Sequence, residues 1–271
     1  MKWTNLFSKT EEISVTAAKK IIETKAQTSY QLVDVRQPKE YQQQHIPGAV
    51  LIPLGELEDR ISELSPDLTT IVYCRSGVRS KAGCQILQKN NFNELRNLTG
   101  GILQWTGATA VGGEEFGLDF FVQNSYSNGF EMAYHLEKGL QQFYTLLSQN
   151  NELPEIKNLL TQMALMEDGH MTTLLLQANT VGATVDVNIS NTSVLEGGLS
   201  PLQLQAAFGD NLTTKEAVLQ LAMMFEAQAW DLYSRLSRKS EIPSEQDFYL
   251  KMAKEEQKHL DKLSTELDNL L

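Results

Sequence analysis

Residues 137–170 read EKGLQQFYTLLSQNNELPEIKNLLTQMALMEDGH, and residues 226–259 read EAQAWDLYSRLSRKSEIPSEQDFYLKMAKEEQKH. The two stretches align without a gap at an offset of 89 residues, and each keeps a lone Glu, a turn proline and a Glu-x-x-His. Ten of the 34 pairs are identical: Glu137/Glu226, Tyr144/Tyr233, Leu147/Leu236, Ser148/Ser237, Glu152/Glu241, Pro154/Pro243, Met163/Met252, Ala164/Ala253, Glu167/Glu256 and His170/His259. A duplication that keeps metal-ligand residue types in register predicts that both copies contribute to one site.

Each copy has the pattern of a helical hairpin. Its turn proline, Pro154 or Pro243, can start the second helix, because proline is tolerated at the first helical position. The lone Glu and the Glu of Glu-x-x-His are equidistant from that turn. At 1.5 Å per residue they face each other roughly 20 Å along the hairpin. A connection over about residues 180–211 must then cross the bundle. Residues 127–271 are therefore predicted to form a four-helix bundle of two duplicated hairpins.

The repeated Glu and His residues are candidate metal ligands. Glu and His at positions i and i+3 share one helix face, so each Glu-x-x-His can hold one metal ion. Carboxylate-rich ligation with one imidazole per metal suits iron, with manganese as the alternative, better than copper or structural zinc. We predict two metal ions held by six ligands: Glu137, Glu167, His170, Glu226, Glu256 and His259. The competing interpretation is that the duplication preserves a bundle core and the charges line a solvated face.

Other polar residues of these helices are interpreted differently. Tyr144 and Tyr233 lie seven residues after the lone Glu, on the same helix face. They are either core aromatics or hydrogen-bond donors to the ligand carboxylates. His135 has no His counterpart in the second copy, and Glu131 and Glu255 lie off the ligand face. These three are predicted not to bind metal.

Over about 145 residues this half resembles the rubrerythrin and bacterioferritin group of ferritin-like proteins, including the Glu-x6-Tyr and Glu-x-x-His elements. The resemblance implies a carboxylate-bridged di-iron site that reacts with dioxygen or peroxide. Rubrerythrins usually carry a further Glu three residues after the third-helix Glu, and that position here is Ala229. They also usually carry a Cys-x-x-Cys rubredoxin module, which this chain lacks. An external electron donor is therefore expected.

Residues 1–108 alternate short apolar runs with helical patterns. The predicted elements are a helix at residues 15–24, strands at 32–35 and 71–73, and a helix at 80–89. Strands that alternate with helices predict an α/β domain with a mainly parallel sheet, whose active loops follow the strands. Glycines recur at positions 107, 112, 113 and 117, which predicts a linker over residues 109–126.

Residues 74–80 read CRSGVRS and join a predicted buried strand to a predicted helix. Backbone N–H groups converge at such a helix start and favour a negative charge on the cysteine sulfur. Arg75 and Arg79 are predicted to lower the thiol pKa and to hold an anionic substrate, so both join Cys74 as candidate catalytic residues. The other residues form the candidate substrate-binding loop: Ser76, Gly77, Val78 and Ser80. Cys84, on the following helix, is interpreted as a packing residue.

The N-terminal half resembles the rhodanese domain over residues 12–108. The matching elements are Asp34-Val35-Arg36 with Glu40-Tyr41, His45-Ile46-Pro47-Gly48-Ala49, the Cys74 loop, and Gly100-Gly101-Ile102 with Trp105. The resemblance implies that Cys74 takes sulfane sulfur from thiosulfate or a persulfide donor, holds it as a persulfide and passes it to a thiol acceptor. Related cysteine phosphatases place the Arg six residues after the Cys, whereas Arg79 is five after Cys74, so this smaller loop suits sulfur better than phosphate. Asp34, Arg36 and His45 are interpreted as structural supports.

Composition and charge argue against several classes of function. Residues 1–110 carry 13 basic and 11 acidic side chains, and residues 111–271 carry 10 and 23, so the net charges of +2 and −13 sum to −11. The acidic half disfavours nucleic acid, and it is either simply solvated or balanced in part by bound cations. No apolar run approaches the roughly 20 residues of a membrane helix, and no nucleotide or flavin motif is present. Two cysteines without a disulfide framework fit a reducing cytoplasm.

The leading functional hypothesis is a redox-linked sulfurtransferase, with persulfide sulfur on Cys74 and a di-iron site for oxidation or for peroxide or dioxygen reduction. A second hypothesis is a rubrerythrin-like peroxide scavenger or sensor whose rhodanese domain is a docking or sulfur-sensing module. A third is non-enzymatic iron binding. The expected partners are a sulfur donor, a thiol acceptor and an external electron donor, with a homodimer as one arrangement considered.

Overall fold

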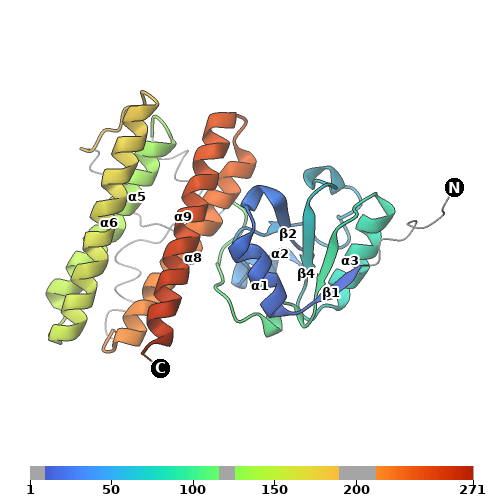
Figure 1. Ribbon diagram of the computed structural model, residues 1–271, viewed down its shortest axis with the longest axis horizontal. Coiled ribbons are helices and arrows are strands. Elements are labelled where there is room, and N and C mark those ends of the chain that lie inside the picture. The colour runs from blue at the N-terminus through green and yellow to red at the C-terminus, as the bar shows by residue number, and fades with distance from the viewer. Residues whose placement is uncertain (1–9, 116–125, 189–211, 271) are drawn as a thin grey trace. The chain divides into compact units, whose positions relative to one another are not determined.

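The computed structural model describes residues 10–115, 126–188 and 212–270. The chain divides into two compact units, Met1–Glu114 and Glu115–Leu271. The N-terminal unit contains a β-sheet with its helices, whereas the long elements described in the C-terminal unit are all helices (Figure 1). The predicted linker spans this boundary, and its residues 116–125 lie outside the described residues. Ala110 forms a backbone bridge with His45, so the N-terminal unit extends past residue 108.

The N-terminal unit is built on a five-stranded parallel sheet with the order β1-β5-β4-β2-β3. Its elements are β1 (Glu11–Ile13), α1 (Val15–Thr24), β2 (Tyr30–Asp34), α2 (Pro38–Gln43), β3 (Val50–Leu51), β4 (Thr69–Tyr73), α3 (Val78–Lys89) and β5 (Leu95–Leu98). Short 3-10 helices lie at Gln27–Ser29, Ile61–Glu63 and Gly101–Gln104. The predicted parallel α/β fold is confirmed for this unit.

The sheet brings two chain segments of the candidate site together. Strand β4 is buried along its whole length, as in parallel sheets covered on both faces. Strands β2 and β4 are neighbours, and the register pairs Asp34 with Tyr73 at their carboxyl ends. The segments that follow these strands therefore leave the sheet side by side. Helix α3 packs back on the sheet through a core that includes Cys84, Leu87 and Val72.

The described part of the C-terminal unit is all-α. Its helices are α5 (Gly129–Asn150), α6 (Pro154–Thr180), α8 (Lys215–Lys239) and α9 (Pro243–Asp268). Pro154 and Pro243 occupy the predicted positions at the starts of α6 and α9. The side chains of Asn128 and Thr214 cap α5 and α8 by accepting backbone N–H groups.

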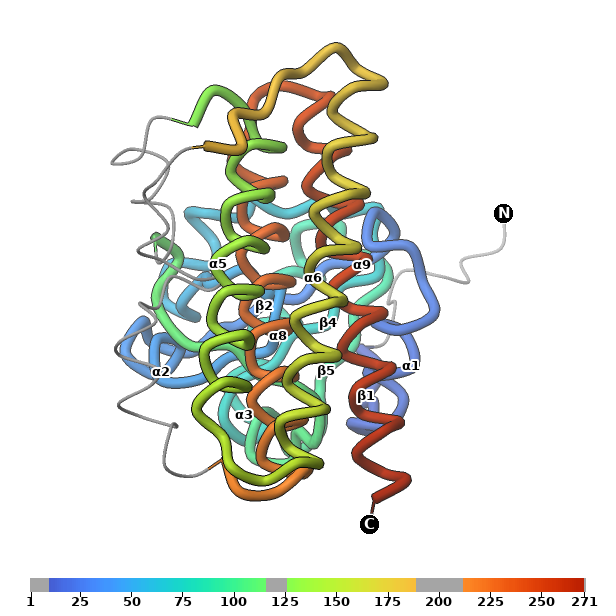
Figure 2. The backbone as a smooth tube through the Cα atoms, turned by 90° about the vertical axis from the view of Figure 1, so that its left-hand side faces the viewer, coloured from blue at the N-terminus to red at the C-terminus, as the bar shows by residue number. Residues whose placement is uncertain are grey.

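The four helices form two hairpins, α5–α6 and α8–α9, that lie side by side in both views (Figures 1 and 2). They share one hydrophobic core, to which each helix contributes: Leu140, Leu160, Phe225 and Leu263 are among its members. Most of the predicted crossing connection, residues 189–211, lies outside the described residues. Within the described parts of the chain, no helix combines the length and apolarity that a membrane crossing requires.

Candidate functional site

Cys74 follows β4, and its side chain is buried at the start of α3. The Gly77 N–H donates a hydrogen bond to Cys74 Sγ at 3.1 Å, and the Ser80 hydroxyl lies 3.5 Å from the same sulfur. Gly77 has φ of 93°, in the left-handed region that favours glycine. A Cβ at this position would also lie 3.1 Å from the Leu98 carbonyl oxygen. The loop therefore needs glycine to direct its N–H at the sulfur.

The environment of Cys74 favours the thiolate. Burial raises the pKa of the Cys74 thiol, but hydrogen bonds from the Ser80 hydroxyl and from the N–H groups of Ser80, Ser76 and Gly77 lower it overall. The sequence predicts that arginines lower this pKa, whereas the main lowering contributions come from a hydroxyl and from backbone N–H groups. A convergent set of amides at a helix start stabilises an anion, and the thiolate is the nucleophilic form of cysteine.

The segment Gly101–Gln104 supports the loop from the other side. The N–H groups of Ile102 and Leu103 donate to the carbonyl oxygens of Cys74 and Arg75 at 2.9 and 3.1 Å. Gly101 has φ of 56°, and a Cβ there would lie 2.3 Å from the Cys74 carbonyl oxygen. The glycine of this segment is thus required by close backbone approach as well as by its conformation.

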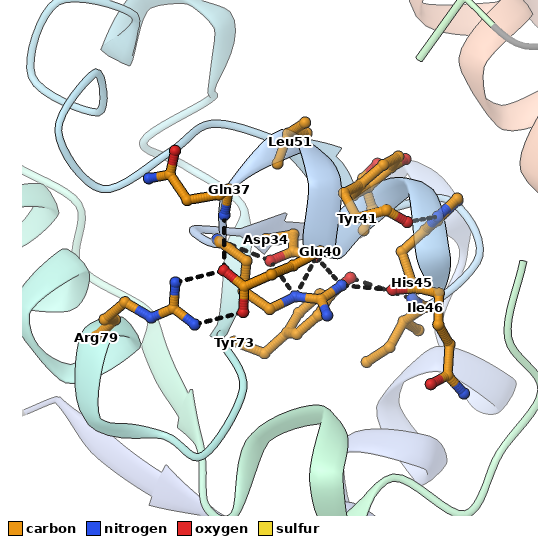
Figure 3. A network of polar contacts seen from close by, with 12 residues as sticks. Asp34, Gln37, Glu40, Tyr41, His45, Ile46, Leu51, Tyr73 and Arg79 are labelled. Carbon is orange, nitrogen blue, oxygen red and sulfur yellow. Dashed lines mark hydrogen bonds and ion pairs between the residues drawn. The ribbon is translucent and has the colours of Figure 1, made fainter. Parts of the chain in front are cut away.

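Arg79 is paired with Glu40 of α2 (Figure 3). Its two terminal nitrogens donate to the two carboxylate oxygens of Glu40 at 2.7 Å each. The Arg79 guanidinium, together with the Gln37 N–H, lowers the pKa of Glu40 to about 2. The sequence does not predict this pairing, although Glu40 lies in one of the matching sequence elements. The Arg75 guanidinium is exposed and makes no hydrogen bond or ion pair with the described residues, so it is available to an anion.

Asp34, Arg36 and His45 are all buried. Arg36 Nη2 lies 2.6 Å from Asp34 Oδ2 and also donates to the Gln44 carbonyl oxygen. The His45 ring stacks on Tyr41, and its Nδ1 lies 2.9 Å from the Tyr41 carbonyl oxygen (Figure 3). The contact from Arg36 to Gln44 ties the segment after β2 to the end of α2, which is the kind of contact a structural role predicts.

Cys84 lies in the core between α3 and the sheet. Burial raises the pKa of its thiol to about 12. A buried thiol with a raised pKa is a poor nucleophile. The contrast with Cys74 agrees with the interpretation of Cys84 as a packing residue.

The C-terminal unit brings the six predicted ligands together as two sets of three. In each set, one atom per residue lies within 4.8 Å of the others: Glu137, Glu167 and His170 form one set, and Glu226, Glu256 and His259 form the other. His170 Nδ1 lies 2.8 Å from Glu167 and 3.4 Å from Glu137. His259 Nδ1 lies 3.2 Å from Glu256 and 3.4 Å from Glu226. The lone Glu of each hairpin thus faces its Glu-x-x-His.

The two sets meet at the histidines. The rings of His170 and His259 stack with their centroids 4.2 Å apart and their planes within 5°. The duplicated hairpins therefore place their ligand sets next to each other, and the cluster, here called the Glu/His cluster, comprises all six side chains.

The Glu/His cluster buries four carboxyl groups beside two imidazoles. Its four carboxylates are at most 4% exposed. Burial raises the pKa of Glu167, Glu226 and Glu256, and repulsion from Glu137 adds to each. Burial lowers the pKa of His170, but Glu137 and Glu167 raise it overall to about 11. A carboxyl with a raised pKa keeps its proton more readily, so all four groups can ionise in this buried site only if positive charge compensates them.

Two carboxylate oxygens of the cluster have no hydrogen-bond partner among the described residues. Glu137 Oε1 and Glu256 Oε1 are buried and accept no hydrogen bond from the described residues. Such atoms are rare in folded proteins, and a bound cation is one kind of group that satisfies them. A cavity of about 360 Å³ borders the cluster. It is lined by Glu137, His170, Thr173, Leu174, Gln177, Met252, Glu255, Glu256 and His259.

The residues predicted not to bind metal have other contacts. His135 Nε2 lies 2.7 Å from the Asp186 carbonyl oxygen, and Glu131 accepts from the Asp186 N–H. Both side chains thus hold the segment after α6 against α5. Tyr144 and Tyr233 are fully buried, and Tyr144 belongs to the hydrophobic core. Their predicted contact with the ligand carboxylates remains a prediction.

Comparison with known proteins identifies the family of the N-terminal unit. The model of the family "Rhodanese-like domain" matches residues 14–108. The putative sulfurtransferase YtwF of Bacillus subtilis is 36% identical over 99 residues, covering 36% of this chain and 93% of that protein. A sulfurtransferase of Allochromatium vinosum is 40% identical over 74 residues, covering 27% of this chain and 69% of that protein. The chain belongs to the rhodanese-like family.

Other relatives are longer than the matched region. The putative sulfur carrier protein YrkF of Bacillus subtilis is 39% identical over 98 residues, covering 36% of this chain. The chain spans 52% of YrkF and 61% of the Bacillus subtilis protein YqhL.

Proposed function

We propose that the protein is a redox-linked sulfurtransferase in which Cys74 carries sulfane sulfur as a persulfide. The observation that carries the proposal is the geometry around Cys74 Sγ, which receives the Gly77 N–H at 3.1 Å and lies next to the Ser80 hydroxyl. These donors stabilise a thiolate, and they can stabilise a persulfide anion in the same way. The names of the relatives YtwF and the Allochromatium vinosum sulfurtransferase support this activity.

The reaction proceeds in two displacements on sulfur. The Cys74 thiolate attacks the sulfane sulfur of thiosulfate, forming a new S–S bond while the old one breaks and sulfite leaves. With a persulfide donor, the leaving group is the donor thiolate. An acceptor thiolate then attacks the outer sulfur, becomes a persulfide and releases the Cys74 thiolate. No electrons are gained or lost overall. The exposed Arg75 guanidinium binds the anionic donor, and Arg79 fixes the end of the loop through Glu40.

The test compares the two cysteines. Sulfite release from thiosulfate, with a small thiol as acceptor, is measured for the unchanged protein, Cys74→Ser and Cys84→Ser. We expect Cys74→Ser to abolish transfer and Cys84→Ser to retain most of it, because only Cys74 has anion-stabilising donors. Equal losses in the two variants would exclude a mechanism with a single nucleophile.

The second part of the proposal is that the C-terminal unit is a ferritin-like bundle whose Glu/His cluster holds two iron ions, with manganese as the alternative. The donor set fits such ions, since it offers four carboxylates and two imidazoles. The buried, unpaired oxygens of Glu137 and Glu256 support the same assignment. Bound iron would supply one-electron chemistry toward dioxygen or peroxide. The six side chains would hold the ions, and the cavity lined by Glu137, Glu256 and the two histidines would give a small molecule access to them.

The cavity beside His170 and His259 favours a second candidate, a peroxide scavenger or sensor in which the rhodanese-like unit docks partners or senses sulfur. An opening of about 360 Å³ admits a small oxidant to the cluster. Peroxide consumption by the iron-loaded protein, measured with a chemical reductant, separates the two functions. Full consumption by Cys74→Ser, together with absent sulfur transfer by the unchanged protein, would favour the second candidate.

A further inference from the structure

Asn97 is a buried amide next to the Cys74 loop. It lies on β5, where the strand register pairs it with Glu12 of β1 and Val72 of β4. Its Nδ2 group donates two hydrogen bonds, to Glu12 Oε2 at 2.6 Å and to the Gly77 carbonyl oxygen at 3.1 Å. Because both partners are acceptors, the nitrogen end of the amide must face them. The two hydrogen atoms of Nδ2 are thus both used.

The other end of the same amide has no partner. Asn97 Oδ1 is buried and accepts no hydrogen bond from the described residues. An unsatisfied buried acceptor destabilises the fold, and an apolar side chain on this interior strand would avoid that cost. The side chain is only 2% exposed, so solvent does not offset the cost. What the position requires is therefore the pair of hydrogen bonds that Nδ2 donates.

Gly77 connects this amide to the nucleophile. Its carbonyl oxygen accepts from Asn97, while its N–H donates to Cys74 Sγ at 3.1 Å. Glycine adopts many backbone conformations, so its N–H points at the sulfur only if the residue is held. Asn97 supplies part of that hold, and the Lys81 N–H, which donates to the same carbonyl oxygen at 3.3 Å, supplies the rest.

Glu12 fixes the amide in turn. Its Oε2 accepts from Asn97, and also from the Thr99 hydroxyl at 3.4 Å. Its Oε1 lies 3.4 Å from Lys81 Nζ in α3. The carboxylate is therefore tied to β5, to the residue after it and to the helix that follows the Cys74 loop. A charged acceptor also strengthens the hydrogen bond that orients Asn97.

We propose that Asn97 is a positioning residue for Cys74, oriented by Glu12 and acting through Gly77. The relay Glu12–Asn97–Gly77–Cys74 keeps a backbone donor aimed at the sulfur, and thereby stabilises the thiolate. This inference rests on the proposed role of Cys74 as the sulfur-carrying nucleophile. It assigns Asn97 no contact with the substrate.

The experiment follows the reactivity of Cys74 with pH. In a Cys84→Ser background Cys74 is the only thiol, because the chain has two cysteines. The rate of alkylation by iodoacetamide is measured from pH 5 to pH 10 for Asn97→Leu and for the control Asn90→Leu. Asn90 also donates from its amide, to the Ile86 carbonyl oxygen at the far end of α3. We expect Asn97→Leu to raise the midpoint of the alkylation profile by about one pH unit, which is a roughly tenfold loss of thiolate at pH values below the midpoint. Asn90→Leu should leave the midpoint unchanged.

A second variant is included in case Asn97→Leu does not fold. Asn97→Ser keeps a shorter hydroxyl donor that cannot reach both acceptors, and we expect a shift in the same direction. Cooperative thermal melting verifies that each sample is folded. Folded Asn97 variants with a lower melting temperature but an unchanged alkylation profile would overturn the relay, because that is the result of a purely structural role. If the unchanged protein had a low midpoint of alkylation but transferred no sulfur, the proposed function would be rejected. The relay would still be supported.

Discussion

The Cys74 loop and the Glu/His cluster are built in opposite ways. The loop stabilises one sulfur with donors from Ser76, Gly77 and Ser80, which lie within six positions of Cys74 in the chain. The cluster draws six side chains from four helices, and 122 positions separate Glu137 from His259. The backbone conformation of the loop determines whether Cys74 is stabilised as a thiolate. The balance of buried charge determines whether the Glu/His cluster is stable. We therefore expect the loop to lose sulfur transfer after small changes of its backbone conformation. We expect the cluster to lose metal after changes in its charge or in its number of ligands.

The largest effect is expected from a single methyl group behind the loop. In Gly101→Ala the new Cβ would lie 2.3 Å from the Cys74 carbonyl oxygen, in a backbone conformation that disfavours side chains. We expect sulfur transfer to fall by more than about 100-fold and the free energy of unfolding to fall by about 3 kcal/mol or more. Thiosulfate turnover and denaturant unfolding measure the two losses.

Gly55→Ala is the matched control for this change. An added Cβ at Gly55 meets no atom within 4 Å. Its transfer rate and stability should stay close to those of the unchanged protein. If Gly101→Ala behaved like Gly55→Ala, the loop would tolerate backbone shifts, and the contrast with the cluster would disappear.

The cluster should lose metal one ion at a time. Either His170→Ala or His259→Ala removes the imidazole of one ligand set, so we expect the iron content to fall from about two ions per chain to about one. Chelation of both ions should lower the melting temperature, since the buried carboxylates would lose their compensating charge. Metal analysis of protein produced with iron available, followed by thermal melting with and without a chelator, tests both points.

His135→Ala is the control for the loss of an imidazole in the same bundle. His135 is buried but contacts the Asp186 carbonyl oxygen, so the iron content should be unchanged. A protein that holds no iron or manganese when both are supplied, and that melts unchanged with chelator, would rule out the metal site. In that case the duplicated charges would serve the bundle alone.

The contrast between local and long-range contacts also explains which elements and site residues the sequence predicts. The sequence predicts helix α1 at its observed bounds, Val15–Thr24, because its apolar spacing is local. It also predicts the members of the cluster, because a duplication records which distant residues belong together. Strands β1 and β3, of three and two residues, are too short to show a periodic pattern. They form by pairing with neighbours that local sequence does not reveal.

Contacts between segments account for the rest. The sequence places Arg79 correctly at the end of the loop but not its pairing with Glu40, which lies 39 positions away. The sequence does not predict the role of Asn97 for the same reason, because a single Asn in a short strand belongs to no sequence motif. Helix α3 starts at Val78, two residues before the predicted start, because the left-handed Gly77 already turns the chain into the helix.

The Glu40–Arg79 pair allows a sharper test of the loop. If Arg79 acts by fixing the loop, Arg79→Lys and Glu40→Gln should lower sulfur transfer by a similar factor, about tenfold each. Lysine cannot make the two parallel hydrogen bonds, and the amide introduced by Glu40→Gln would lack the negative charge. Steady-state rates with thiosulfate give the comparison. A loss in Arg79→Lys without a loss in Glu40→Gln would show that Arg79 binds the substrate directly.

The smallest expected effect is on stability, and its sign follows from the pKa of Glu40. That pKa is lowered to about 2, chiefly by the hydrogen bonds from Arg79, so the pair stabilises the folded state at pH values above the ordinary carboxyl pKa. The contribution is lost as the pH falls toward 2. Because both side chains are about one-third exposed, at 35% and 30%, we expect Glu40→Gln to lose only about 0.5–1 kcal/mol at pH 7.

Glu63→Gln is the control for this pair. Glu63 has a similar partner in Arg60, at 2.6 Å, and its pKa is also lowered by hydrogen bonds from that arginine. Urea unfolding at pH 7 and pH 3 should show the same small, pH-dependent stability loss for Glu40→Gln and Glu63→Gln. Only Glu40→Gln should also slow sulfur transfer, because only its arginine belongs to the Cys74 loop. Equal activity in the two variants would mean that the pair stabilises the fold without shaping the loop.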